Sequence, residues 1–157
     1  MGRRQHSLLG FTLIETLLVL TIIAVMAVLS VPFYQSFQIR TQLDDRSEEI
    51  VQSLRKAQSK AMAVEDDKVF GVHFENNKFV LFKNTPYNPD DPDNEITDLP
   101  ATLSISFNLN GGGSEVVFDK LKGTTANDGT VSISSVNNES RTINVSQVGK
   151  IEVGAVP

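Results

Sequence analysis

Residues 10 to 15 read Gly-Phe-Thr-Leu-Ile-Glu and open an apolar stretch that continues to about Phe33. One acidic residue, Glu15, lies inside this stretch. The segment from Phe11 to Tyr34 is long enough to cross a bilayer as a helix, which takes about 20 residues. An acid within such a helix costs about 2.5 to 3.5 kcal/mol on insertion scales, so we expect Glu15 to have a partner or a specific purpose.

The residues before the apolar stretch are basic. Arg3 and Arg4 precede it, and the first ten residues include no acid. Positive flanks favour the cytoplasmic side of a membrane. The sequence therefore predicts a single-pass protein with a cytoplasmic N-terminus and a C-terminal domain on the other side of the membrane.

A basic leader, a small residue and a long apolar helix with one early acid together resemble the class III signal of type IV pilins and type II secretion pseudopilins. The resemblance covers roughly residues 3 to 55. It implies a leader of residues 1–10, which a prepilin peptidase removes by cutting after Gly10. It also implies that the same enzyme methylates Phe11 and that Pro32 loosens the helix.

The resemblance gives Glu15 a role in assembly, which is to pair with the N-terminal amine of a neighbouring subunit. Cleavage after Gly10 would expose that amine at Phe11, within the apolar layer. Opposite charges attract far more strongly there than in water. Because Glu15 lies one helical turn from Phe11, an ion pair within one chain is the alternative.

Three other interpretations of the N-terminus are possible. A secretory signal peptide has an uncharged apolar core of about 7 to 15 residues and a small-residue cleavage site, whereas Glu15 interrupts this stretch and no clear Ala-x-Ala site follows it. Arg3 and Arg4 suggest a twin-arginine signal, but Gln5-His6-Ser7 is unlike that signal. The third interpretation is a plain membrane anchor. The pilin interpretation includes it, because pilins span the membrane before assembly.

Composition limits the remaining possibilities. The chain has 157 residues, which suggests one external domain after the helix. Its formal net charge of −5 does not favour general attraction to nucleic acid or anionic lipid. The sequence contains no cysteine, so the domain must be held together by core packing without disulfides.

The sequence predicts an α+β fold of the pilin kind, a long N-terminal helix over residues 11–63 packed on a small, mainly antiparallel β domain over residues 64–157. The first half of the helix, residues 11–34, is the expected transmembrane part. Beyond it, apolar residues recur at helical spacing and should face a sheet; these are Ile39, Leu43, Ile50, Leu54, Ala57 and Ala61. The β-rich runs that follow are Val69–Phe74, Phe79–Phe82, Ala101–Leu109, Val116–Phe118, Thr130–Val136, Arg141–Val145 and Lys150–Val153. We expect Asn84 to Pro100 to be a loop.

The C-terminal half carries a second resemblance. The residues that carry it are Phe118-Asp119, Gly123-Thr124, Gly129-Thr130-Val131, the run from Arg141 to Ser146, and Gly149-Lys150-Ile151. Together they resemble the GspH/FimT-type minor pseudopilins. This implies a minor subunit of the filament. Some members of that group bind DNA through a Gly-Arg-x-Arg pattern, where this chain has Gly149-Lys150-Ile151-Glu152, with an acid in place of the second cation. The candidate DNA-binding cations are Lys120, Lys122, Arg141 and Lys150.

Other chemistry has weak support in the sequence. Acidic residues between Asp90 and Glu95 could bind calcium, but they lack the spacing and the glycine of an EF-hand loop, so a solvated acidic loop is expected. His73 has no visible catalytic or metal partner in the sequence. We find no catalytic motif, and we expect no enzyme, no cofactor and no metal site.

We therefore expect a minor pilin or pseudopilin, a structural subunit of a type II secretion pseudopilus or a type IV pilus. Its expected partners are other pilin subunits, the prepilin peptidase, the assembly platform of the bacterial inner membrane, and lipid before assembly. Two alternatives stay open. One is a tip module that binds DNA or a secreted substrate, and the other is a simple membrane-anchored envelope domain.

Overall fold

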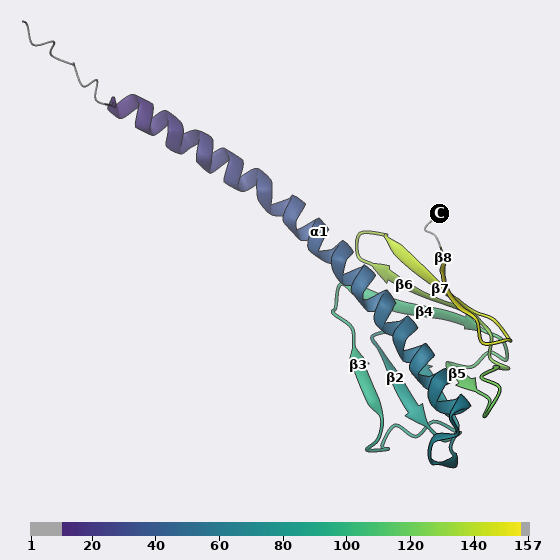
Figure 1. Cartoon of the computed structure of the whole chain (residues 1–157). Helices are drawn as coiled ribbons and strands as arrows, with labels where there is room; N and C mark the ends of the chain where they lie inside the picture. The colour runs from purple at the N-terminus through teal and green to yellow at the C-terminus, as the bar shows by residue number, and fades with distance from the viewer. Residues whose placement is uncertain (1–10, 155–157) are drawn as a thin grey trace, which may run out of the picture. The chain divides into compact units, whose positions relative to one another are not determined.

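The computed structural model describes residues 11–154, with only the backbone described for residues 30–33. The chain separates into two compact units, Met1–Phe37 and Gln38–Pro157. One long helix, α1 (Leu13–Met62), forms most of the described first unit and opens the second (Figure 1). Eight strands follow it within the described residues, so the predicted α+β fold is confirmed.

The second part of α1 buries the apolar stripe that the sequence predicts, except for Ile39, which is only half-buried. Leu43, Ile50 and Leu54 are completely buried, as are Ala57 and Ala61. Because these positions repeat every three or four residues, they lie on one face of the helix and contact the sheets together. The helix ends at Met62, where Val64 adopts a left-handed conformation (φ 52°) before a short 3₁₀ turn, Glu65–Asp67.

The first sheet has the strand order β3-β2-β1-β5 and is antiparallel throughout. Its strands are β1 (Phe70–Phe74), β2 (Lys78–Lys83), β3 (Glu95–Asp98) and β5 (Glu115–Phe118). Figure 1 shows β2 and β3 beside the C-terminal part of α1. β1 and β2 form an antiparallel hairpin and are joined by residues 75–77, which include Asn76 and Asn77.

The second sheet has the order β4-β6-β7-β8 and is also antiparallel. Its strands are β4 (Leu103–Leu109), β6 (Gly129–Ser135), β7 (Ser140–Val145) and β8 (Ile151–Gly154). The two sheets meet where the N–H of Ile105 donates to the carbonyl of Asn76 at 2.8 Å. Alternation along β4 and β6 places apolar side chains on the face toward the core and serines and threonines on the other.

The core lies between α1 and the inner faces of the two sheets. Phe74, Phe79 and Phe118 from the first sheet and Ile133 and Ile143 from the second are at most 1% exposed. Burial of each such side chain contributes about 1.5 to 3 kcal/mol. This core of aliphatic and phenylalanine side chains holds the unit together without disulfides.

One expectation about the strands is wrong. The loop predicted for residues 84–100 includes β3, which pairs with β2 so that Ile96 lies opposite Val80. The four residues of β3 are mostly exposed and include two acids, so they show none of the apolar alternation that marks a half-buried strand. Pairing with β2 determines this strand, and its own sequence carries little signal.

Candidate functional site

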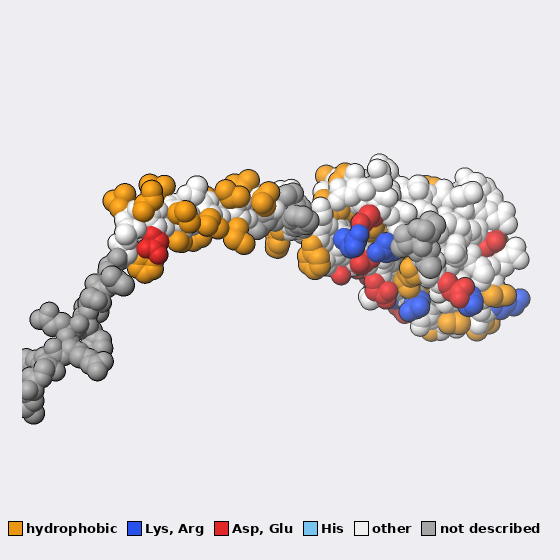
Figure 2. Space-filling model, turned by 90° about the horizontal axis from the view of Figure 1, so that it is seen from above, with side chains coloured by type: hydrophobic (Ala, Val, Ile, Leu, Met, Phe, Trp, Pro, Cys, Tyr) orange, Lys and Arg blue, Asp and Glu red, His pale blue; other side chains and the backbone are white. Residues whose placement is uncertain are grey.

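The first turns of α1 carry the residues that the sequence assigns to assembly. Every side chain from Phe11 to Leu29 is exposed, including Leu13 (83%) and Ile14 (74%). Figure 2 shows hydrophobic side chains along this part of the helix. Soluble monomers rarely expose apolar surface of this extent. The helix is also long and apolar enough to cross a membrane.

Thr12 and Glu15 begin this helix. The N–H of Glu15 donates to the hydroxyl oxygen of Thr12 at 3.3 Å, and the N–H of Thr16 donates to the carbonyl of Thr12 at 3.2 Å. A threonine with a glutamate three residues later has the spacing of a capping box, which pairs N–H groups that the first turn leaves unbonded. Reasoning from the sequence missed this role, although the T-x-x-E pattern was available to indicate it.

The position of Glu15 therefore admits two functions. Its carboxylate lies in the first turn of α1, where the helix dipole favours a negative charge. It is also the only acidic residue between Phe11 and Leu29, among side chains that are all exposed. The first function stabilises the helix start, and the second offers a charge to a partner.

Two predicted site residues lie outside what the structure describes. Gly10, the expected cleavage position, precedes the described residues. The side chain of Pro32 is likewise outside the description, although the backbone there is helical.

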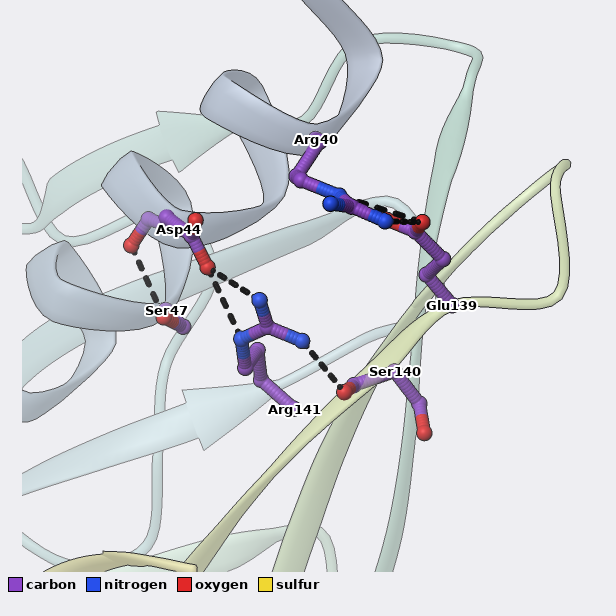
Figure 3. Close-up of polar contacts among 6 residues, drawn as sticks. All are labelled: Arg40, Asp44, Ser47, Glu139, Ser140 and Arg141. Atoms are coloured by element: carbon purple, nitrogen blue, oxygen red, sulfur yellow. Dashed lines mark hydrogen bonds and ion pairs between the residues drawn. The ribbon is translucent and has the colours of Figure 1, made fainter. Parts of the chain in front are cut away.

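In the second unit, two ion pairs join the β6–β7 hairpin to α1 (Figure 3). The Arg40 guanidinium donates through Nε to both carboxylate oxygens of Glu139, at 3.2 and 3.1 Å, and through Nη2 to one of them. The Arg141 guanidinium donates through Nε to Oδ1 of Asp44 at 2.8 Å and through Nη1 to the carbonyl of Ser140 at 3.0 Å. The helix and the hairpin therefore each contribute one cation and one anion to the two pairs.

The ion pair between Arg40 and Glu139 shifts the pKa of both residues. Hydrogen bonding to Arg40 lowers the pKa of Glu139 from its usual value, and the same contact raises the pKa of Arg40. Both residues are ionised at neutral pH. The pair is therefore intact there and is weakened in acid.

Arg141 occupies a position that restricts it to this contact. In the register of the second sheet it pairs with Ile133, two residues before the buried Ile143, so it lies on the face that packs against α1. Its side chain is only 19% exposed, and Asp44 binds its charge at 2.8 Å. The alternation Arg141-Thr-Ile143-Asn-Val145 already placed the arginine in phase with buried residues, and this signal was overlooked.

The other predicted cations are more exposed. Lys120 contacts Asp67 at 2.8 Å, and Lys150 contacts Glu152 at 2.7 Å. Lys122 is exposed and has no ion pair within the described part of the chain. Three of the four candidate DNA-binding cations thus have a carboxylate of the same chain as partner, and Arg141 lies on the α1 side of its sheet.

The acidic loop and His73 were also candidates. Within residues 11–154, no group of three or more histidine, aspartate or glutamate side chains is arranged to hold a metal ion. His73 does have partners that the sequence did not indicate. Its Nδ1 lies 3.3 Å from the carboxylate of Glu115, and its ring stacks on Tyr87 with centroids 4.1 Å apart. The ring of Tyr87 also meets that of Phe82 edge-on, with centroids 5.2 Å apart, so Tyr87 contacts both β1 and β2.

Comparisons of the chain with protein-family models, with curated proteins and with solved structures gave no match.

Proposed function

We propose that this chain is a prepilin that is inserted in the membrane, cut after Gly10, methylated at Phe11 and assembled as a minor pilin or pseudopilin. The observation that carries the proposal is the run of exposed apolar side chains from Phe11 to Leu29 with Glu15 as its one acid. Such a segment suits two environments in succession, lipid before assembly and the packed helices of a filament afterwards.

The charge of Glu15 would favour transfer of this helix from lipid to a contact with a neighbouring subunit. An unpaired carboxylate in lipid is costly, and pairing with an ammonium group of a neighbouring chain removes part of that cost. The methylated amine at Phe11 would be such a group at matching depth. Pairing thereby makes entry into the filament favourable and fixes the depth of one helix relative to the next.

The compartment follows from the orientation that the basic leader predicts. The N-terminus would lie in the cytoplasm and the β domain in the periplasm, held by a single span of the bacterial inner membrane. The prepilin peptidase and the assembly platform would act on it there. The protein itself is a structural subunit and hydrolyses nothing in this proposal.

The charge of Glu15 can be tested apart from its role in the capping box. Glutamine satisfies the capping box as glutamate does, so Glu15→Gln keeps the helix start and removes the charge. We expect Glu15→Gln to be cut after Gly10 normally but to be recovered poorly in filaments. The measurement is the ratio of assembled to membrane-bound processed chain after shearing.

Thr12→Val is the matched control, because it removes the cap and leaves the charge. It should reduce assembly much less than Glu15→Gln does. If Glu15→Gln assembles as the wild type does, the carboxylate is not used in assembly. If the processed wild-type chain stays in the membrane and none is recovered in filaments, a simple membrane-anchored domain becomes the better account.

DNA binding is the second candidate function, and the contacts described above reduce its support. Arg141 is committed to Asp44, and two of the three lysines have acidic partners. A gel shift at low salt with wild type and Lys122→Ala tests it directly, since contacts to phosphate are most stable at low ionic strength. We expect no shift of DNA with either protein.

A further inference from the structure

The connection that leaves β4 contains the only asparagine–glycine sequence of the chain. Asn110 and Gly111 follow directly on Leu109, the last residue of β4. The N–H of Gly112 donates to the carbonyl of Leu109 at 3.1 Å and closes a turn with Asn110 and Gly111 at its two central positions. Gly111 has φ 87°, as the second central residue of a type II turn requires. The fold therefore favours a glycine after this asparagine.

The turn leaves the backbone nitrogen of Gly111 accessible. Its N–H makes no hydrogen bond within the part of the chain that the structure describes. A Cβ built on Gly111 would have Nδ2 of Asn127 as its nearest neighbour, at 3.8 Å, and one built on Gly112 would meet nothing within 4 Å. Asn110 is exposed as well. The Gly111 nitrogen is thus open to water and to the side chain of Asn110.

The side-chain amide of Asn110 is an electrophile next to this nitrogen. Attack of the Gly111 nitrogen on Cγ of Asn110 forms an N–Cγ bond and closes a five-membered succinimide ring. The Cγ–Nδ2 bond breaks, and Nδ2 leaves as ammonia with the proton that the Gly111 nitrogen gives up. Water then opens the ring at either of its two C–N bonds, which gives aspartate or isoaspartate. The sequence of steps consumes only water.

We propose that Asn110 is a site of spontaneous deamidation in the folded protein. Asn77 and Asn138 are also exposed, but they precede Lys78 and Glu139, whose Cβ atoms hinder the attack. Glycine has no Cβ, so the hindrance is absent after Asn110. The inference goes beyond the proposed function and does not depend on it, because it concerns only the chemistry of the β domain.

Deamidation would change the contact between β4 and β6, which are adjacent in Figure 1. The N–H of Asn110 donates to the carbonyl of Asp128 at 2.7 Å, and Nδ2 of Asn110 donates to Oδ1 of Asp128 at 3.2 Å. These bonds extend the ladder beyond the pair of Leu109 with Gly129. The product loses the Nδ2 donor and places a second carboxylate beside that of Asp128. Like charges repel, so this end of the ladder should open more often.

Peptide mapping by mass spectrometry tests the site in the full chain in detergent. During incubation at mildly alkaline pH, Asn110 should deamidate at least about tenfold faster than Asn77 or Asn138, which corresponds to a barrier lower by about 1.4 kcal/mol. The rate should fall in mild acid, because the Gly111 nitrogen must lose its proton. Both aspartate and isoaspartate should form, since direct hydrolysis of the amide would give aspartate alone. Equal rates at the three asparagines, or aspartate alone, would overturn the proposal.

The same incubation in guanidinium chloride distinguishes the folded turn from the unfolded peptide. We expect the folded chain to lose the Asn110 amide at a rate within about tenfold of the unfolded chain, a barrier difference below about 1.4 kcal/mol. If Asn110 stays intact in the folded chain and reacts only in the unfolded one, the contact with Asp128 protects the amide. That result would contradict the proposal.

Asn110→Gln is the matched variant, because it keeps a side-chain amide and would have to close a less favourable six-membered ring. On ion-exchange chromatography, the wild type should accumulate a more acidic form during incubation, and Asn110→Gln should not. Accumulation of the acidic form at the same rate in both proteins would assign the reaction to another residue.

Asn110→Asp reproduces the charge of the product and tests its effect on the sheet. Hydrogen exchange should become faster in residues 107–110 and 128–131 and change little elsewhere. Asn138→Asp is the control, because it adds the same charge in the turn between β6 and β7, and it should leave these residues unchanged. If Asn110→Asp exchanges like the wild type, the proposed effect on β4 and β6 is wrong.

Discussion

The guanidinium of Arg141 lies 2.8 Å from the carboxylate of Asp44, although the two residues are 97 positions apart in the sequence. The contact joins β7 to α1 on the side of the sheet that faces the helix. An arginine that would be a candidate for phosphate binding by composition alone thus holds the fold together. Its removal should affect stability before it affects binding.

Asp44→Ala tests this assignment. It would leave the Arg141 guanidinium, which is 19% exposed, without its carboxylate. We expect the free energy of unfolding to fall by about 1 to 2 kcal/mol, between the values for exposed and buried pairs. Urea unfolding of the full chain in detergent, followed by circular dichroism, measures it. Lys122→Ala is the control and should change stability little, and an equal loss in both variants would refute the assignment.

The Arg40–Glu139 pair predicts a dependence on pH. The pKa of Glu139 is lowered by Arg40, so the pair's contribution is fully present above the unfolded-state pKa of glutamate, about 4.3. It is lost as the pH falls through the lower folded-state pKa. The difference in unfolding free energy between wild type and Glu139→Gln should therefore be constant near neutrality and shrink in acid. If the difference in unfolding free energy between the two proteins increased in acid, it would contradict this prediction.

Gly71 is predicted to resist substitution. A Cβ built there would lie 2.7 Å from the carbonyl oxygen of Val116 and 3.0 Å from the ring of Phe82. The first atom belongs to the backbone of the paired strand and cannot rotate away. Gly71→Ala should lower the free energy of unfolding by about 1 to 3 kcal/mol, the usual cost of overpacking.

Gly113 is the matched control for Gly71. A Cβ built there meets nothing within 4 Å, so Gly113→Ala should be neutral or slightly stabilising, by up to about 1 kcal/mol. Thermal unfolding of the two variants under one set of conditions makes the comparison. Similar melting temperatures for both would contradict the packing described for Gly71.

Gln58 is predicted to stabilise the two loops that carry Leu121 and Val148. Gln58→Leu would leave the carbonyls of Gly123 and Gly149 without their shared donor and should cost about 1 to 3 kcal/mol. Hydrogen exchange should also increase in both loops and little elsewhere. Gln52 is exposed on the same helix, so Gln52→Leu should show neither effect. Faster exchange in one loop alone would show that Gln58 does not couple them.

Much of the fold could be predicted from the sequence because strong periodicity determines it. The apolar stripe from Leu43 to Ala61 predicted the buried face of α1. In β4, alternate residues from Leu103 to Leu109 are apolar and lie on the buried face, and Phe107 is the most exposed of them at 36%. β3 could not be predicted, because its four residues have weak patterning and its partner strand decides its conformation.

The candidate site could be predicted in part. The apolar helix with Glu15 is evident from composition, and the capping role of Thr12 follows from spacing that was not considered. The contacts of Arg141 and Lys120 depend on acids distant in sequence, so counting cations could not reveal them. The hydrogen bond from Leu121 to Ala61 likewise joins two positions that lie far apart in the sequence.

The most direct test of the central claim is intact mass with N-terminal sequencing of the protein from its native membrane. The account predicts a chain that begins at N-methylated Phe11. A chain that begins at Met1, or one cut beyond Ser30, would contradict it and would indicate a plain anchor or a secreted domain.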